Sequence, residues 1–203
     1  MARINTLTKS NRGKEIKCSK CGKVITAGMK YLKATPYHRA DIIRCISCGL
    51  KFWETSGSEY VQTIGSICDD WRDSGVYDGR AEEIAEELEE LKDSQQESLD
   101  NMPENLQYGS TGEMLQERID ELDGVIDELN GIAWSDYEED AEDEVKGEVG
   151  DWNESDDEIR TVAREQFSSE EEWKEAFEEK KTSYIEEQYA DAIDEALGNL
   201  SYE

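Results

Sequence analysis

Apolar residues recur at two different spacings along this 203-residue chain, and the change comes near residue 54. Before that point, short apolar runs are separated by turn-forming residues, which is typical of short β-strands. We predict strands at residues 23–26, 29–34 and 41–45, interrupted at Ala27-Gly28 and at residues 36–39. After that point, apolar residues lie three or four positions apart, as on one face of an α-helix. The pattern predicts an α+β protein, with a small N-terminal β module followed by a mostly α-helical region.

The first predicted helix follows the β module directly. Ser56 or Ser58 can cap it, and its pattern extends through Trp71. Its apolar face carries Tyr60, Ile64, Ile67, Cys68 and Trp71. We expect this face to pack against the β module, so that residues 1–75 form one domain. Cys68 is then expected to be a small buried hydrophobic residue.

Residues 76–134 carry a regular apolar pattern that predicts two paired helices. The first helix ends near Pro103 and carries Ile84, Leu88, Leu91, Leu99 and Met102. The second begins at a capping box from Ser110 to Glu113. Its apolar residues alternate at intervals of four and three: Leu115, Ile119, Leu122, Ile126, Leu129 and Ala133. This is the heptad spacing of helices that pack lengthwise, so with the short link at 105–109 we predict an antiparallel helical hairpin.

The remaining residues are acidic and less regular. We interpret residues 135–157, with many Asp and Glu and two glycines, as an acidic linker. Residues 158–203 return to helical spacing, with apolar positions Ile159, Val162, Phe167, Trp173, Phe177, Ile185, Tyr189, Ile193 and Leu197. Capping boxes at Ser155 and Ser169 are expected to begin these C-terminal helices.

The charge changes sign at the same boundary as the apolar spacing. The whole chain has a formal net charge of −29, from 51 Asp+Glu and 22 Lys+Arg. Residues 1–53 hold 12 Lys+Arg and 2 Asp+Glu, whereas residues 54–203 hold 10 Lys+Arg and 49 Asp+Glu. Leu, Ile, Val and Phe make up only 37 of the 203 residues, which excludes one large core. Two modules of different purpose are indicated, one basic and one acidic.

The strongest motif lies in the basic module. It consists of two C-x-x-C-G elements, Cys18 to Gly22 and Cys45 to Gly49. Each C-x-x-C presents two thiolates on a tight loop, and the following glycine permits a positive φ that turns backbone N–H groups toward the sulfurs. We therefore predict one structural Zn²⁺ held by Cys18, Cys21, Cys45 and Cys48, in a zinc-ribbon or treble-clef-like fold. With four thiolates this zinc would have no open position for catalysis.

A redox or iron–sulfur role fits these cysteines less well. A redox dithiol needs only one pair and a thioredoxin-like βαβ frame, which is missing here. An iron–sulfur cluster is a minor alternative. The single histidine, His38, is expected to be an exposed turn residue between the strands.

The basic residues of the module suggest a second kind of contact. Some lysines can balance the negative charge of a Zn(Cys)₄ centre. The others lie among aromatic residues, a mixture that suits phosphate contacts with base stacking. As candidates for nucleic-acid binding we select Lys14, Lys30, Lys33, Arg39 and Arg44. A contact with the acidic residues of the same chain, or with an acidic partner protein, accounts for the same charge.

The chain also resembles a known group of proteins. The segments that carry the resemblance are the N-terminal Met-Ala-Arg-Ile-Asn-Thr, the first cysteine element with its following Lys23, Gly28-Met-Lys-Tyr, and two pieces of the predicted hairpin at 100–107 and 115–119. Over roughly residues 1–130 it is similar to small zinc-finger proteins encoded by tailed bacteriophages. The resemblance implies a phage setting and a zinc site, but no activity.

No feature predicts an enzyme, because the sequence has no P-loop, G-x-S-x-G or H-E-x-x-H motif and no Cys–His nucleophile arrangement. Two classes of binding protein remain. In the first, residues 1–53 contact nucleic acid or a nucleoprotein complex while the acidic helices bind a protein partner. In the second, the acidic helices imitate nucleic acid and inhibit a DNA- or RNA-binding protein of the host, in defence or transcription. The acidic surface can also serve solubility alone.

The location is predicted from what the sequence lacks. No apolar run approaches the length of a membrane span, and the N-terminus has no apolar signal stretch. We expect a cytoplasmic protein, in the host cell if phage-encoded, whose cysteines stay reduced. The partner and the oligomeric state are not predicted.

Overall fold

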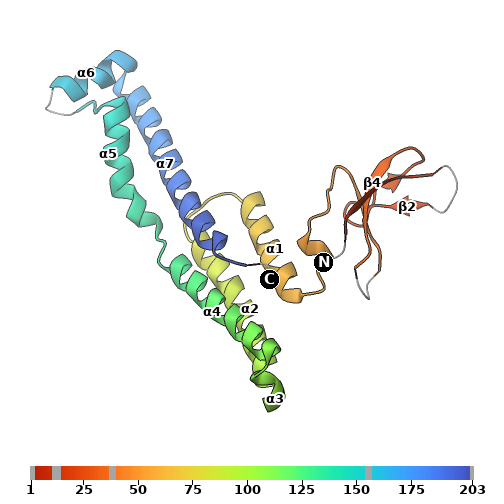
Figure 1. Cartoon of the computed structure of the whole chain (residues 1–203). Coiled ribbons are helices and arrows are strands. Elements are labelled where there is room, and N and C mark those ends of the chain that lie inside the picture. The colour runs from red at the N-terminus through yellow and green to blue at the C-terminus, as the bar shows by residue number, and fades with distance from the viewer. Residues whose placement is uncertain (1–2, 11–14, 37–39, 154–156, 202–203) are drawn as a thin grey trace. The chain divides into compact units, whose positions relative to one another are not determined.

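A computed structural model of the chain describes residues 3–10, 15–36, 40–153 and 157–201. It forms two compact units, residues 1–69 and residues 70–201. The first contains small antiparallel sheets and the second is helical, so the predicted α+β class is confirmed (Figure 1). None of the helices in the described part of the chain combines the length and the apolar character needed to span a bilayer.

The N-terminal unit is built on two small sheets. The larger has the order β1–β4–β5, from Asn5–Thr8, Lys30–Ala34 and Ile42–Cys45. The smaller pairs β2 (Ile16–Lys17) with β3 (Val24–Ile25). The central strand β4 pairs with both neighbours, so Tyr31 faces Leu7 on one side and Cys45 on the other. The predicted strands correspond to β3, β4 and β5, whereas β1 and β2 were not predicted.

One short 3₁₀ helix and the first α-helix complete this unit. Trp53–Thr55 form η1, and Glu59–Asp73 form α1, whose residues 59–69 belong to the N-terminal unit. Gly65 of α1 is covered by the Trp53 ring, since a Cβ at Gly65 would lie 2.2 Å from that ring. Lys51 also pairs with Asp69 at 2.5 Å. These contacts place the first helix against the segment that follows β5, and the unit ends at Asp69 rather than at the predicted residue 75. Cys68 is buried as predicted.

The helical unit begins with the predicted hairpin. Helix α2 (Arg80–Asp100) and helix α4 (Ser110–Asn130) lie side by side, joined by the short α3 (Glu104–Gln107) (Figure 1). Lys92 of α2 pairs with Asp123 of α4 at 2.8 Å, as antiparallel helices require. The apolar seam between them is buried at Ile84, Leu88, Leu91, Leu115, Ile119, Leu122, Ile126 and Leu129.

Two details of the hairpin differ from the prediction. Ser110 is the first residue of α4 rather than its cap, because the cap position is Gly109 and no side-chain cap bond forms. Ala133 is exposed and lies beyond the helix, so the seam ends at Leu129.

The interpretation of residues 135–157 as a linker was wrong for most of that segment. Trp134–Tyr137 form the 3₁₀ helix η2, and Glu138–Val149 form the helix α5. The apolar positions of α5 are Ala141, Val145 and Val149, four residues apart and all buried. They are small and surrounded by carboxylates, so the sequence signal is weak. Val145 and Val149 gain their burial from the large side chains Trp173 and Phe177 of a later helix.

The C-terminal region is helical as predicted, and the predicted apolar positions of its long helix are buried. Helix α6 covers Asp157–Gln166 and helix α7 covers Glu170–Gly198. Ser169 caps α7 as predicted, since its side chain accepts from the Glu172 N–H at 3.2 Å. The box is offset by one residue, because the Glu172 carboxylate accepts from the N–H of Ser168. The proposed cap at Ser155 lies outside the described residues.

Helix α7 joins the parts of the helical unit. Its first half packs beside α5, and its second half reaches the α2–α4 hairpin (Figure 1). There the hydroxyl of Tyr189 accepts from the Ala81 N–H at 3.0 Å. Asp194 of α7 also accepts from the indole N–H of Trp71, near the end of α1, at 2.8 Å. Trp134 of η2 meets the Tyr189 ring edge-on, with centroids 5.2 Å apart. Long-range polar contacts therefore fix the position of α7 on the hairpin.

Candidate metal centre and charged surfaces

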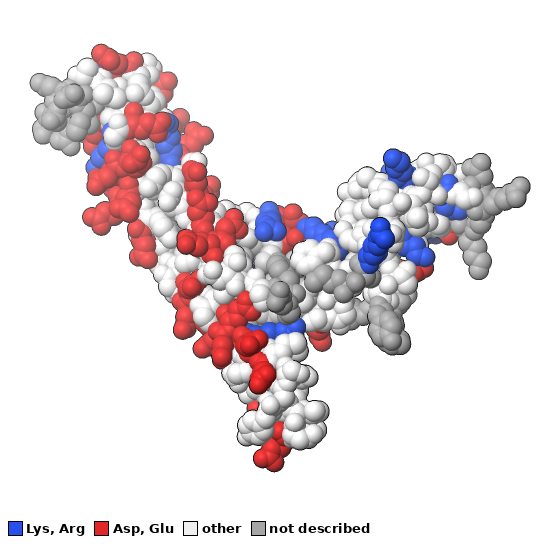
Figure 2. All heavy atoms as spheres, in the orientation of Figure 1, with Lys and Arg blue, Asp and Glu red and all other residues white. Residues whose placement is uncertain are grey.

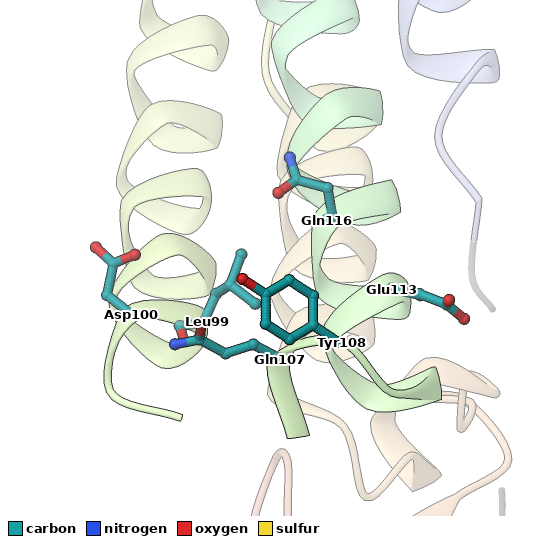
Figure 3. Close-up of a pocket in the computed structure, with 7 residues that line it drawn as sticks. Leu99, Asp100, Gln107, Tyr108, Glu113 and Gln116 are labelled. Carbon is teal, nitrogen blue, oxygen red and sulfur yellow. The ribbon is translucent and has the colours of Figure 1, made fainter. Parts of the chain in front are cut away.

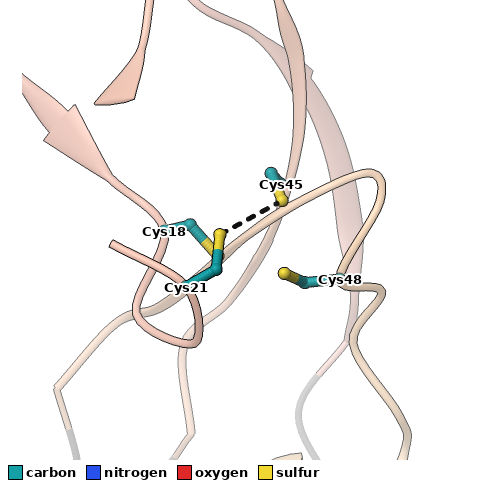
Figure 4. A group of neighbouring side chains, drawn as sticks. All are labelled: Cys18, Cys21, Cys45 and Cys48. Atoms are coloured by element: carbon teal, nitrogen blue, oxygen red, sulfur yellow. Dashed lines mark hydrogen bonds between the residues drawn. The ribbon is translucent and has the colours of Figure 1, made fainter. Parts of the chain in front are cut away.

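The four motif cysteines lie together in the N-terminal unit (Figure 4). Cys18 and Cys21 come from the loop between β2 and β3, whereas Cys45 ends β5 and Cys48 follows it. Their sulfur atoms all lie within 4.8 Å of one another, and the Sγ atoms of Cys21 and Cys45 are 3.8 Å apart. A tetrahedral zinc site with bonds of about 2.3 Å has sulfur–sulfur edges of about 3.8 Å. The cluster therefore has the size of a metal site.

Backbone geometry explains why each C-x-x-C element ends in glycine. Gly22 and Gly49 have φ values of +71° and +65°, a region that residues with a side chain rarely adopt. The first turn is closed by the Gly22 N–H donating to the Cys18 carbonyl at 2.9 Å. The second is closed by the Cys48 N–H donating to the Cys45 carbonyl at 3.1 Å. Both turns direct their sulfur atoms to the same point.

The thiols of the cluster differ in acidity. Burial opposes ionisation of Cys18, but backbone N–H groups including those of Cys21 and Cys45 lower the pKa of this thiol to about 6. Hydrogen bonds from the Cys48 side chain and backbone lower the pKa of Cys45. Conversely, hydrogen bonding to Cys45 and Cys21 raises the pKa of Cys48 to about 12. Four thiolates at this spacing need a cation among them, and a bound metal ion supplies that charge.

All five cysteines of the chain are free thiols in this structure. Thiolate ligands without histidine or carboxylate suit soft or borderline metals such as Zn²⁺. Cys68 is buried and is not part of the cluster. The four clustered cysteines are thus the ones predicted from the sequence, and their thiolates fit a metal ion.

Arg44 was selected as a nucleic-acid contact, but its side chain holds the cluster loops together. It lies in β5 directly before Cys45, and only 13% of its side chain is exposed. Its guanidinium donates to the Ser19 hydroxyl, inside the first cysteine loop, and to the Glu54 carboxylate at 2.7 Å. Glu54 in turn accepts from the Lys51 N–H at 2.9 Å. Arg44 and Glu54 therefore connect both cysteine loops to η1.

The other candidates have different surroundings. Lys33 pairs with Asp41 at 2.5 Å, and this pair lowers the pKa of the Asp41 carboxyl. Lys30 is exposed. Lys14 and Arg39 lie outside the described residues. The structure therefore describes three of the five candidates. Lys30 is exposed, whereas Lys33 and Arg44 each have a carboxylate partner.

Sequence reasoning missed Glu54 and the Trp53–Gly65 contact. Neither belongs to a sequence motif. Their contacts, with Arg44 and with Gly65, form only because of the path that the chain takes through η1. The one available signal was Glu54 itself, the first carboxylate after a stretch that is almost entirely basic.

The helical unit presents a contrasting surface. Residues 70–201 contain 45 Asp+Glu and 10 Lys+Arg. Several of these bases pair within the unit, as Lys146 does with Glu142 at 2.7 Å and Lys174 with Glu170 at 2.7 Å. Because carboxylates outnumber bases so strongly, most of them cannot have a basic partner within the unit. Figure 2 shows Asp and Glu over much of the visible face of these helices, with some Lys and Arg among them, whereas the charged residues visible on the N-terminal unit are mostly Lys and Arg.

No family model, curated protein or solved structure matches this chain. The resemblance to phage zinc-finger proteins therefore stays a prediction.

Proposed function

We propose that this protein is a non-enzymatic, zinc-binding interaction protein. Its N-terminal unit holds one structural Zn²⁺ and contacts nucleic acid or a nucleoprotein complex. Its acidic helices bind a basic protein partner. The sulfur spacing of the cysteine cluster supports the zinc, because it matches the edges of a tetrahedral thiolate site.

The observation that carries the protein-binding role is the charge density of the hairpin. Helices α2 and α4 together hold 16 carboxylates and 3 basic residues, a net charge of −13. Each helix has 21 residues and is about 31 Å long. The pair therefore carries one net negative charge per about 2.4 Å of its length, and duplex DNA carries one per about 1.7 Å. Such a surface attracts basic proteins over a Debye length.

The exposed lysines around the cysteine loops support the nucleic-acid role. Lys20 and Lys23 lie in the first cysteine loop and Lys30 begins β4, and all three are exposed. They are available for phosphate contacts, unlike Arg44 and Lys33.

Elemental analysis and titration of the full chain test these roles separately. We expect one zinc per chain and binding to single- or double-stranded probes that weakens steeply between 50 and 200 mM salt. Replacing Lys20, Lys23 and Lys30 by Glu is expected to abolish probe binding, whereas replacing three exposed bases of the helical unit, Arg72, Arg164 and Lys174, by Glu is the matched control. Absence of probe binding by the parent chain would contradict the nucleic-acid role, and probe binding that survives the triple change would contradict its assignment to these lysines.

A second candidate function follows from the same charge density, which is within about twofold of that of DNA. The hairpin can occupy the nucleic-acid groove of a basic DNA- or RNA-binding protein as a mimic. In that case the full chain displaces duplex DNA from such a protein, and extra DNA displaces the chain. Simultaneous binding of DNA and this chain to the partner would instead favour the first function.

A further inference from the structure

The tip of the hairpin differs from the rest of the helical unit in exposing large apolar side chains. In residues 70–201, four such side chains are exposed among those that the structure describes: Tyr77, Leu106, Tyr108 and Met114. Three of the four lie within nine residues, in α3, in the turn after it and in the first turns of α4. Tyr108 is 81% exposed and Leu106 is 49% exposed. Apolar side chains gathered in this way on a charged surface mark an interaction site.

The tip has a fixed shape. Gly112 in the first turn of α4 lies against the backbone at Gln107, so close that a Cβ at Gly112 would lie 1.9 Å from the Gln107 carbonyl oxygen. The Gln107 side chain donates to the carbonyl of Leu99 at 3.2 Å and to that of Met102 at 2.9 Å. Helix α3 is thereby tied to the ends of both long helices. The exposed Tyr108 side chain therefore projects from an ordered turn.

A hollow of about 420 Å³ lies beside Tyr108 (Figure 3). Its walls include Leu99, the Tyr108 ring, and the polar side chains of Asp100, Glu113 and Gln116. In Figure 3 the Tyr108 ring lies between the end of α2 and the start of α4, and Asp100 and Glu113 lie on opposite sides of it, with their carboxylates directed outward from the ring. An aromatic face flanked by carboxylates suits an ammonium or guanidinium group on an aliphatic stem.

The charge around the tip has one sign only. Residues 93–117 contain six carboxylates and no Lys, Arg or His. A neutral or acidic partner segment would meet uncompensated negative charge here, and a purely basic one would leave Leu106 and Tyr108 uncovered. The complementary segment is one with both properties.

We propose that the hairpin tip is the docking site for a basic amphipathic segment of the partner protein. The apolar residues of that segment cover Leu106 and Tyr108, and one Lys or Arg enters the hollow between Asp100 and Glu113. This inference rests on the proposed binding of a basic partner by the acidic helices, and it adds where the contact is made and what kind of segment makes it.

Two labelled peptides test the proposal on the full chain by fluorescence anisotropy. One is a 16-residue helix of Lys and Leu with one apolar face, and the other is a 16-residue oligolysine. Replacing Leu106 and Tyr108 together by Ser is expected to weaken binding of the Lys–Leu peptide by about tenfold, because buried aromatic anchors dominate such interfaces. Binding of the oligolysine is expected to stay within about twofold, since it depends on total charge.

A matched pair of charge variants tests the carboxylates. Asp100→Asn with Glu113→Gln removes the two charges beside the hollow, and Glu186→Gln with Glu187→Gln removes two exposed charges from α7. The tip pair is expected to weaken the Lys–Leu peptide more than the α7 pair does. Circular dichroism checks that every variant keeps the helical content of the parent chain.

The outcomes separate this inference from the proposed function. If the parent chain binds both peptides and the Leu106 and Tyr108 change alters neither, the tip is not the docking site and the proposed function stands. Equal weakening of both peptides by that change also overturns the inference, because no apolar contact would then be specific to the tip. If the parent chain binds neither peptide, both proposals fail.

Discussion

The two units of this chain are held together in opposite ways. The part of the N-terminal unit before α1 has short strands and few buried apolar residues, and its loops converge on four sulfur atoms. Units of this size rarely fold on an apolar core alone and commonly use a metal or disulfides. Residues 70–201 have no such centre in their described part, and long helices instead share apolar contacts along their length. Loss of one ligand should therefore affect residues 1–58 as a whole, whereas loss of one apolar contact should affect the helical unit in proportion to its burial.

The units also differ in how they treat charge. In the N-terminal unit Arg44, Lys33 and Lys51 each have a carboxylate partner. In the helical unit carboxylates outnumber bases by more than four to one. Charge thus contributes local contacts in the first unit and net repulsion in the second.

The largest expected effect is loss of the metal. Structural zinc contributes about 10–16 kcal/mol in small zinc domains, more than a unit of this size gains from its core. Chelation, or the Cys48→Ser change, is expected to unfold residues 1–58 and leave the α2–α4 hairpin helical. Elemental analysis and hydrogen exchange along the chain measure both effects.

Cys68→Ala is the matched control, because Cys68 is buried and is not part of the sulfur cluster. It should keep one zinc per chain. Full zinc content in folded Cys48→Ser would contradict the proposed ligand set.

The second effect concerns the centre of the hairpin seam. Leu122 is 0% exposed, and Leu122→Asp would place a carboxylate among apolar side chains. Together, the lost burial and the buried charge exceed about 4 kcal/mol, so we expect the hairpin to unfold while the zinc content stays at one per chain. Circular dichroism together with elemental analysis checks this.

Gly124→Asp adds the same carboxylate two residues away, at an exposed position with open space around it. Its effect is expected to stay within about 1 kcal/mol. Equal destabilisation by the two changes would show that added charge, and not loss of the seam, is responsible.

The features that could be predicted from the sequence are those that depend on local spacing. The cysteine elements with Gly22 and Gly49 require only a tight turn, and the hairpin seam requires only repeated apolar intervals. The structural role of Arg44 could not be predicted, because it depends on η1 bringing Glu54 back to the Arg44 guanidinium. Helix α5 was missed because its apolar face is formed by Ala141 and valines, and its stability depends on α7, which follows later in the chain.

A smaller effect is expected from one hydroxyl group in the helical unit. Tyr189 is 1% exposed, and its hydroxyl accepts from the Ala81 N–H at the start of α2. Tyr189→Phe leaves that buried N–H without its partner, at a cost of about 1–3 kcal/mol. Denaturant unfolding of the helical unit measures the loss.

The matched control is Tyr108→Phe, which also removes a tyrosine hydroxyl, but from a ring that is 81% exposed. Its stability is expected to match that of the parent chain. If Tyr189→Phe were equally neutral, α7 would not be fixed to α2 by this bond.

The smallest effect per residue is that of carboxylate charge on the stability of the helical unit. Lowering the pH weakens the fold at paired carboxylates and strengthens it at unpaired ones. Hydrogen bonds from Lys146, Lys174 and Ser168 lower the pKa values of Glu142, Glu170 and Glu172 respectively. A carboxyl whose pKa is lower in the folded state stabilises the fold above its ordinary pKa of 4.5. That contribution is lost only as the pH falls through the lower folded value, so these three pairs persist at pH 5.

The numerous carboxylates without basic partners act in the opposite direction. Their mutual repulsion is screened by salt over about 10 Å at 0.1 M and is reduced by partial protonation near pH 5. The melting temperature of the helical unit is therefore expected to rise from low to moderate salt, to rise again from pH 7 to pH 5, and to fall below about pH 4.5 as the paired carboxylates protonate. The same salt should weaken binding of the oligolysine peptide. A melting temperature that does not change with salt would mean that these carboxylates do not repel one another, and the mimic function would then lose its dense negative surface.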